Sequence, residues 1–135
     1  MTIANRTLQR ADALAQRVET FGDVAVDTAP LAALLGADHL SDASIVVNTT
    51  SVSLGAKPFR IRPTFTPRDC LFVDLVYGSH DAPFLAAARR AGRPTLDGAG
   101  MLLHQGALAF EAWTERKAPL AAMARALRTQ GLTIG

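Results

Sequence analysis

The chain has 135 residues, of which 49% are apolar and 19% charged, a composition typical of one soluble globular domain. Its formal net charge is +2, its charges are interspersed and only 6% of its residues are aromatic, which argues against a nucleic-acid groove. One cysteine, Cys70, excludes an internal disulfide and suits a reducing cytoplasm. No apolar run approaches the ~20 residues of a membrane span, and residues 1–6 lack a signal-peptide core. We therefore expect one cytoplasmic domain over residues 1–135 with neither nucleic-acid nor membrane partners.

The first third of the chain is predicted to contain two strands and two helices. Apolar residues at helical spacing follow Thr7, which can serve as an N-cap. A short apolar run after Gly22 is typical of a strand, and Pro30 is typical of a helix start. The predicted elements are a strand at 2–4, a helix over 8–18, a strand at 24–26 and a helix over 28–35 that ends at Gly36.

The rest of the chain alternates strands and helices around one long connection. Residues 44–48 are apolar and mostly β-branched without alternation, which is typical of a parallel strand buried on both faces. Three prolines predict an irregular segment over 52–69. Further elements are predicted as strands at 71–76 and 95–97 and as helices over 82–91, 101–113 and 119–131, the first of these helices capped by Asp81. The alternation predicts an α/β fold, a doubly wound parallel sheet with helices on both faces.

Polar or glycine-containing segments follow four of the predicted strands. In such sheets ligands bind beyond the carboxyl ends of the strands, so these segments are expected to form the rim of a small-molecule site. They are Asn5-Arg6-Thr7, Asn48-Thr49-Thr50-Ser51, Tyr77-Gly78 and Asp97-Gly98.

Arg6 follows the first strand, with Arg10 one helical turn beyond it. In dinucleotide-binding folds an acidic residue at this place binds a free ribose 2′-hydroxyl, whereas an arginine accommodates a 2′-phosphate. The planar guanidinium fork matches phosphate oxygens, and the first N–H groups of a helix add donors. The alternative is a solvated N-terminal tail with an ordinary capping threonine.

Other chemical patterns in the chain are weaker. Gly98-Ala99-Gly100 is not a pyrophosphate loop, because Leu103 stands where a third glycine is needed and the strand before it comes late. His39, His80 and His104 lack metal-ligand spacing, and Ser51, His80 and Asp81 lack a nucleophile elbow. Met101 and Gln105 share one helix face just after Asp97-Gly98, which makes them candidates for the site.

Four strings, in this order and at this spacing, resemble the shikimate dehydrogenase family over about residues 2–130. The strings are Asn5-Arg6-Thr7-x-x-Arg10-Ala11, Asn48-Thr49-Thr50-Ser51, Val73-Asp74-Leu75-Val76-Tyr77 and Asp97-Gly98-Ala99-Gly100-Met101-Leu102-Leu103-His104-Gln105. The last of them continues into the family's Gln-x-x-x-x-Phe-x-x-Trp pattern, here Gln105, Phe110 and Trp113.

The resemblance implies an NADP-dependent oxidoreductase that reversibly reduces 3-dehydroshikimate to shikimate on the route to aromatic amino acids. It implies that the adenosine 2′-phosphate is bound by Asn5, Arg6, Thr7 and Arg10, and that Thr50 and Ser51 lie along the cofactor. It further implies that the nicotinamide end is lined by Leu75, Gly98 and Met101, and that the substrate is contacted by Tyr77 and Gln105. It places no catalytic residue in this chain, because the family's Lys and Asp for proton transfer lie in an N-terminal domain.

The chain also departs from the family pattern. Ser53 stands where the family usually has glycine. The family's first strand, glycine-rich loop and substrate domain would all precede residue 1. In the strand order 3-2-1-4-5-6, that first strand lies between the strands at 2–5 and 44–48. We therefore expect the isolated chain to associate with another copy, or to join its two half-sheets directly.

Three functional hypotheses remain at this point. The first is the cofactor-binding part of a shikimate dehydrogenase, inactive alone. The second is a non-catalytic remnant of the same fold that binds a nucleotide or a protein. The third is a related quinate/shikimate dehydrogenase, because the resemblance places substrate choice largely in the N-terminal domain.

Overall fold

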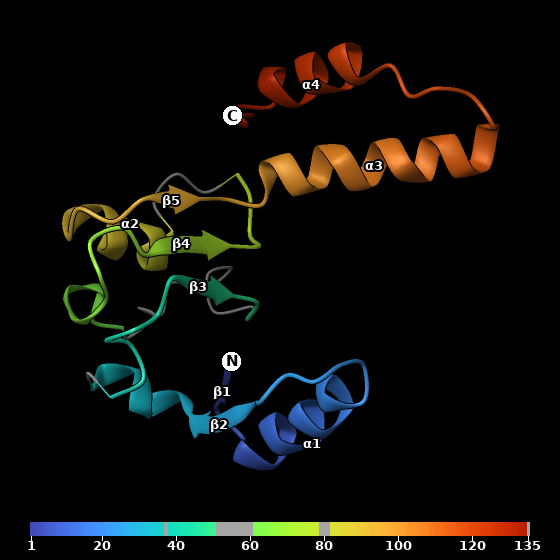
Figure 1. Cartoon of the computed structure of the whole chain (residues 1–135). Coiled ribbons are helices and arrows are strands. Elements are labelled where there is room, and N and C mark those ends of the chain that lie inside the picture. The colour runs from blue at the N-terminus through green and yellow to red at the C-terminus, as the bar shows by residue number, and fades with distance from the viewer. Residues whose placement is uncertain (37, 51–60, 79–81, 135) are drawn as a thin grey trace.

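The computed structural model describes residues 1–36, 38–50, 61–78 and 82–134. Within these ranges the chain forms two parallel sheets, with helices at their sides and a pair of helices at the C-terminal end (Figure 1). The parallel strands and intervening helices confirm the predicted α/β fold, and they form a partial Rossmann-like sheet.

The first sheet pairs β1 (Thr2–Asn5) with β2 (Asp27–Pro30), and α1 (Leu8–Glu19) connects the two strands. The predicted strand at 24–26 and helix start at 28–30 are wrong. Residues 24–26 form no strand because Val24 N–H closes a turn onto Gly22 and its side chain is exposed. Residues 28–30 instead pair with β1, which buries Ala29. Only the 3₁₀ helix η1 (Leu31–Leu35) remains of the predicted helix, and it ends at Gly36 as expected.

The second sheet has the order β3 (Ile45–Asn48), β4 (Leu71–Asp74), β5 (Thr95–Leu96), all parallel. The helix α2 (Pro83–Arg90) contacts β4 and β5. The rings of Phe72 and Phe84 lie 5.5 Å apart at the centre of the core. The 3₁₀ helix η3 (Pro63–Phe65) lies in the predicted irregular connection, and Phe65 packs against this core.

One face of β3 is open to solvent. The expectation that residues 44–48 are buried on both faces is therefore wrong for the described structure, in which the side chains of Ile45 and Val47 are 58% and 50% exposed. Val46 points to the other face and packs against the core beneath α2. Figure 1 shows α2 behind the second sheet and no helix in front of β3 and β4.

The two sheets do not join. β1 pairs with β2, β3 pairs with β4, and no pairing between β1 and β3 occurs among the described residues. The expectation that the half-sheets join directly is therefore wrong. The arrangement does match a strand order with one position open between β1 and β3, as the order 3-2-1-4-5-6 implies.

Two helices, α3 (Ala99–Thr114) and α4 (Leu120–Thr129), form an antiparallel pair at the C-terminal end (Figure 1). The α3 helix starts two residues earlier than predicted because the Asp97 carboxylate accepts a 3.0 Å hydrogen bond from Ala99 N. It ends at Thr114, and the next residue, Glu115, adopts a left-handed φ of 54°. Within the described residues, no helix has the length and apolar character needed to span a membrane.

Candidate functional site

Asn48 and Asp74 lie side by side at the carboxyl ends of β3 and β4. Asn48 Nδ2 donates a 3.2 Å hydrogen bond to Asp74 Oδ2, and both side chains are buried. Asp74 Oδ1 accepts a 3.1 Å bond from Val76 N, so the carboxylate also shapes the chain after β4. The Asp74 carboxylate therefore joins the end of β3 to the backbone after β4, at the edge where ligands bind in such sheets.

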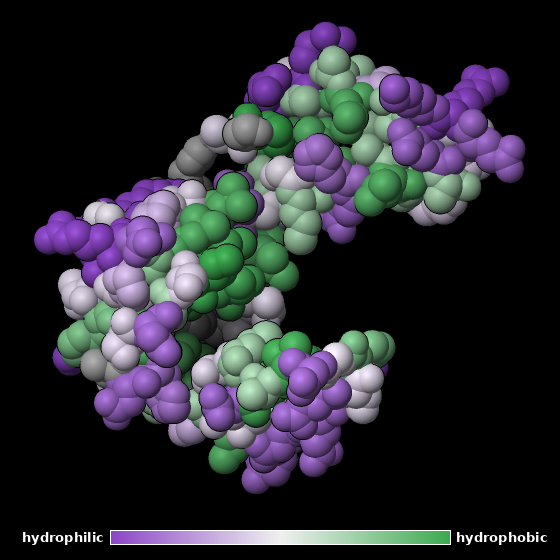
Figure 2. Space-filling view, in the orientation of Figure 1, coloured by the Kyte–Doolittle hydropathy of each residue, from purple (hydrophilic) through white to green (hydrophobic). Residues whose placement is uncertain are grey.

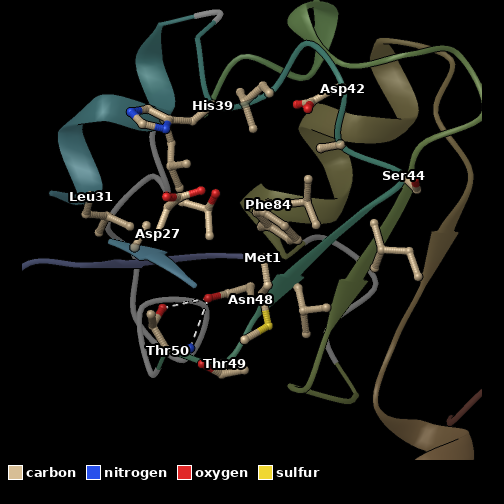
Figure 3. Close-up of a pocket in the computed structure, with 18 residues that line it drawn as sticks. Met1, Asp27, Leu31, His39, Asp42, Ser44, Asn48, Thr49, Thr50 and Phe84 are labelled. Atoms are coloured by element: carbon tan, nitrogen blue, oxygen red, sulfur yellow. Dashed lines mark hydrogen bonds between the residues drawn. The ribbon is translucent and has the colours of Figure 1, made fainter. Parts of the chain in front are cut away.

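Thr49 and Thr50 are the described residues of the Asn48–Ser51 segment that follow β3. Asn48 Oδ1 accepts hydrogen bonds from Thr50 N at 3.0 Å and from Thr50 Oγ1 at 2.7 Å (Figure 3). This is an Asx-type turn, in which a side-chain oxygen substitutes for a backbone acceptor. Ser51, the other predicted cofactor residue of this segment, lies outside the described residues.

Gly98 packs against the backbone that follows β4. A Cβ atom at this position would overlap the Leu75 carbonyl oxygen and lie 2.8 Å from the carbonyl carbon. Gly98 N–H donates to Val76 O at 3.3 Å, which ties the two loops together. The structure therefore brings Leu75 and Gly98 into direct contact. It also gives a reason for glycine at 98 that is independent of any ligand, namely the close approach of two backbone segments.

The remaining predicted residues on this side are exposed. Met101 and Gln105 lie in the first two turns of α3, four residues apart and therefore on one side of the helix. Tyr77, just beyond β4, is 47% exposed, and Gly78 beside it adopts a φ of 79°. These side chains are free to contact a ligand at the carboxyl edge.

The residues of the predicted 2′-phosphate clamp lie between β1 of the first sheet and the start of α1. Asn5 Oδ1 accepts a 3.0 Å hydrogen bond from Thr7 N, so Asn5 shapes the turn between β1 and α1. Thr7 occupies the predicted N-cap position but makes no side-chain cap bond. Arg6 and Arg10 are exposed, and the first turn of α1 contains no acidic residue.

A cavity of about 680 Å³ lies between the two sheets (Figure 3). Ala4 lines it from β1, Asn48 from the end of β3, and Thr50 from the segment after β3. The cavity therefore extends from β1, the strand that precedes Arg6, to the predicted cofactor residue Thr50. Leu75, Gly98 and Met101 do not line this cavity.

Asp74 is the structural centre of the site, although the sequence reasoning gave it no role beyond its place in a family string. A carboxylate within the apolar run Leu71–Val76 is the signal that could have identified it, because a buried charge needs hydrogen-bond partners. Asn48, at the end of an equally apolar strand, is such a partner.

Parallel strands connected by helices, with polar loops at their carboxyl ends, define the doubly wound α/β class, whose members bind small molecules and nucleotides at that edge. Residues 98–128 match the model of the shikimate 5′-dehydrogenase C-terminal domain. The chain thus resembles the C-terminal part of the shikimate dehydrogenases.

Individual relatives support the same assignment. A shikimate dehydrogenase (NADP(+)) from Nitrobacter hamburgensis is 41% identical over 133 residues, which are 98% of this chain and 45% of that protein. The shikimate 5-dehydrogenase of Thermus thermophilus, solved with NADP(H) and shikimate, is 32% identical with a TM-score of 0.72 and matches 96% of this chain and 45% of its own. A quinate dehydrogenase from Corynebacterium glutamicum, solved with NAD, is 28% identical with a TM-score of 0.80, over 95% of this chain and 45% of its own. The chain therefore spans about half the length of these relatives.

Proposed function

We propose that the chain is the NADP-binding part of a shikimate dehydrogenase that reversibly reduces 3-dehydroshikimate to shikimate. The observation that carries this proposal is the pair of exposed guanidinium groups, Arg6 and Arg10, at the start of a 12-residue helix with no acidic residue in its first turn. Two such groups beside the free N–H groups of a helix suit a 2′-phosphate, which fits NADP better than NAD. The resemblance to NADP(+)-dependent relatives supports the same cofactor.

In this proposal the two sheets hold opposite ends of the cofactor. Arg6, with Asn5, Thr7 and Arg10, binds the adenosine 2′-phosphate. Thr50 and Ser51 lie along the cofactor, and Leu75, Gly98 and Met101 line its nicotinamide end. NADPH, when bound, supplies the hydride, and the protein contributes binding and orientation.

Tyr77 and Gln105 are proposed to contact the substrate from this part of the enzyme. Both side chains are exposed, and both belong to elements that follow the carboxyl ends of β4 and β5. A phenol hydroxyl and a carboxamide can each hydrogen-bond a polyhydroxylated acid. The groups that transfer the proton are proposed to lie in the part of the relatives that this chain does not match, so the chain alone is expected to show no turnover.

A quinate dehydrogenase is the second candidate, because the Corynebacterium glutamicum quinate dehydrogenase matches this fold with a TM-score of 0.80. That protein was solved with NAD, whereas Arg6 favours NADP here. A non-catalytic domain that binds a nucleotide or a protein is the third candidate. It is favoured if the cofactor binds but no substrate is turned over in any assembled form.

The decisive experiment measures cofactor binding and turnover separately. NADPH and NADH are titrated against the chain, alone and joined behind the unmatched N-terminal part of the Nitrobacter hamburgensis relative, and followed by nicotinamide fluorescence. The joined protein is then assayed with 3-dehydroshikimate and with 3-dehydroquinate. We expect preference for NADPH and reduction of 3-dehydroshikimate. Equal binding of both cofactors would contradict the 2′-phosphate assignment, and turnover by the chain alone would contradict the proposed location of the proton-transfer groups.

A further inference from the structure

The loop after β4 carries Tyr77 between two anchors. On one side of Tyr77, the Val76 N–H donates a 3.1 Å hydrogen bond to Asp74 Oδ1. On the other side, the side chain of Leu132 packs against Gly78, where a Cβ atom would lie 3.3 Å from Leu132 Cδ2. The second anchor therefore comes from the segment that follows α4.

The turn that ends α4 places Leu132 against this loop. Gly131 adopts a left-handed φ of 81°, and its N–H donates to Arg128 O at 3.0 Å. The Leu132 N–H donates to Leu127 O at 3.2 Å. Together these features form the Schellman motif, in which glycine supplies the left-handed residue. In residues 132–134 the first and last side chains are half-buried and the middle one is exposed, so one side of this segment lies against the molecule.

The α4 helix also contacts α3 beside Gln105. A Cβ atom at Gly106 would lie 3.4 Å from Met123 Cε, an ordinary packing distance. Figure 2 shows the helix pair as a lobe that projects beyond the second sheet, and Figure 1 shows α4 running back along α3 toward that sheet. Through Met123, α4 therefore contacts the residue after Gln105. Through Leu132, the segment that follows α4 contacts the residue after Tyr77.

We propose that Leu132 is a positioning residue for substrate binding. Its side chain holds the loop after β4 against the end of α4. Because α4 also packs on α3, Tyr77 and Gln105 then keep a fixed separation. This inference rests on the proposed function, which places these two side chains against the substrate. Leu132 acts through the backbone of Gly78 and not by touching the substrate itself.

Tyr77 benefits from such an anchor because its side chain is 47% exposed and so gains little from packing. A loop residue that moves freely loses conformational entropy when it binds a ligand, and fixing the loop in advance removes part of this cost. Gly78 has a φ of 79° and leaves the place of a Cβ atom free, beside which Leu132 packs. The loop is therefore shaped to receive a side chain from the segment after α4.

Fluorine NMR of the chain alone tests the anchor. Tyr77 is the one tyrosine of the sequence, so fluorotyrosine incorporated into the chain gives a line that reports on this residue. Leu132→Ala is expected to move or broaden that line by more than its original width, whereas Leu132→Met keeps the volume of the side chain and should leave the line in place. Leu120→Ala is the matched control, because Leu120 lies at the opposite end of α4. An unchanged line in Leu132→Ala, or an equal change in Leu120→Ala, would refute the anchor.

Steady-state kinetics test the consequence for the substrate. The assay uses the chain joined behind the unmatched N-terminal part of the Nitrobacter hamburgensis relative, with NADPH and 3-dehydroshikimate. Leu132→Ala is expected to raise KM by about 2–10-fold, the worth of one hydrogen bond from Tyr77, and to leave kcat unchanged. In a Tyr77→Phe background it is expected to raise KM no further, because the hydroxyl through which Leu132 acts is absent. Equal effects in the two backgrounds, or a loss of kcat alone, would refute the positioning role.

The two measurements separate this inference from the proposed function. If the joined protein does not reduce 3-dehydroshikimate, the proposed function fails, and the fluorine line still decides whether Leu132 holds Tyr77 in place. If the joined protein is active but Leu132→Ala behaves like Leu120→Ala in both measurements, the positioning role fails alone.

Discussion

The amide of Asn48 donates a 3.2 Å hydrogen bond to the carboxylate of Asp74, and both side chains are almost completely buried. Asn48 Oδ1 also accepts a hydrogen bond from Thr50 N, and the second carboxylate oxygen of Asp74 accepts one from Val76 N. One buried contact therefore fixes the ends of β3 and β4 together with the two loops that follow them. These loops carry the predicted cofactor residues Thr50 and Leu75.

Asp74→Asn is expected to destabilise the chain by about 1–3 kcal/mol. The single oxygen of an amide that accepts from Val76 N would leave the new NH₂ group facing the NH₂ group of Asn48, so the bond from Asn48 would be lost. Urea unfolding followed by circular dichroism measures the change. Asp23→Asn is the matched control, since Asp23 is exposed and should change stability by less than about 0.5 kcal/mol. Similar losses in both variants would show that the buried contact contributes nothing specific.

Gly98→Ala and Gly100→Ala are expected to act in opposite directions, although they are two residues apart. At position 98 the new Cβ overlaps the backbone of Leu75, so we expect a loss of about 1–3 kcal/mol from overpacking. At position 100 nothing lies within 4 Å and the residue is in α3, so alanine should stabilise by about 0.5 kcal/mol. Urea midpoints of the two variants test this. A neutral Gly98→Ala would contradict the close approach of the two loops.

The fold class and most element positions could be predicted from the sequence because the strands at 45–48 and 71–74 are continuous apolar runs bounded by turn residues. β2 could not, because Asp27–Pro30 contains only one buried apolar side chain and its pairing depends on a distant strand. Local propensity favours a helix start at Pro30, but the pairing of β2 with β1 outweighs this preference. The exposed face of β3 was also missed, since the apolar pattern reports what a strand can bury and not what covers it.

For the candidate site, the sequence indicated which loops to examine but not how they are held. The motifs located Gly98 and Leu75 separately, and only the three-dimensional structure shows that one backbone leaves no room for a side chain on the other. Long-range pairs such as Asn48 and Asp74, 26 residues apart, depend on strand register, which the residue pattern alone does not set.

The free energy of unfolding is expected to fall at high pH because of the buried thiol of Cys70. Burial raises the pKa of the Cys70 thiol above its ordinary value of 9.0, and a hydrogen bond with Thr66 opposes this to a smaller extent. The folded chain therefore binds this proton more tightly than the unfolded chain. The protonated thiol therefore makes its full contribution to the free energy of unfolding below about pH 9. This contribution is lost as the pH rises through the raised pKa, by up to about 1.4 kcal/mol per pH unit.

Comparison with Cys70→Ala isolates this effect. The difference in unfolding free energy between the unmodified chain and the variant should be constant from pH 6 to 8 and should shift against the unmodified chain above about pH 9. Urea unfolding at each pH under reducing conditions measures it. A difference that stays constant up to pH 10 would show that the thiol titrates alike in the folded and unfolded states.

Arg6→Asp is expected to weaken NADPH binding by about 10–100-fold while NADH binding changes only severalfold, because the substitution replaces a phosphate-matching guanidinium with a carboxylate suited to a free 2′-hydroxyl. The measurement is a fluorescence titration of the chain joined behind the N-terminal part of the Nitrobacter hamburgensis relative. Arg17→Asp makes the same charge change in the last turn of α1, so it separates a local contact from a general loss of positive charge. Equal weakening by Arg6→Asp and Arg17→Asp, or equal losses for the two cofactors, would remove the 2′-phosphate role from Arg6.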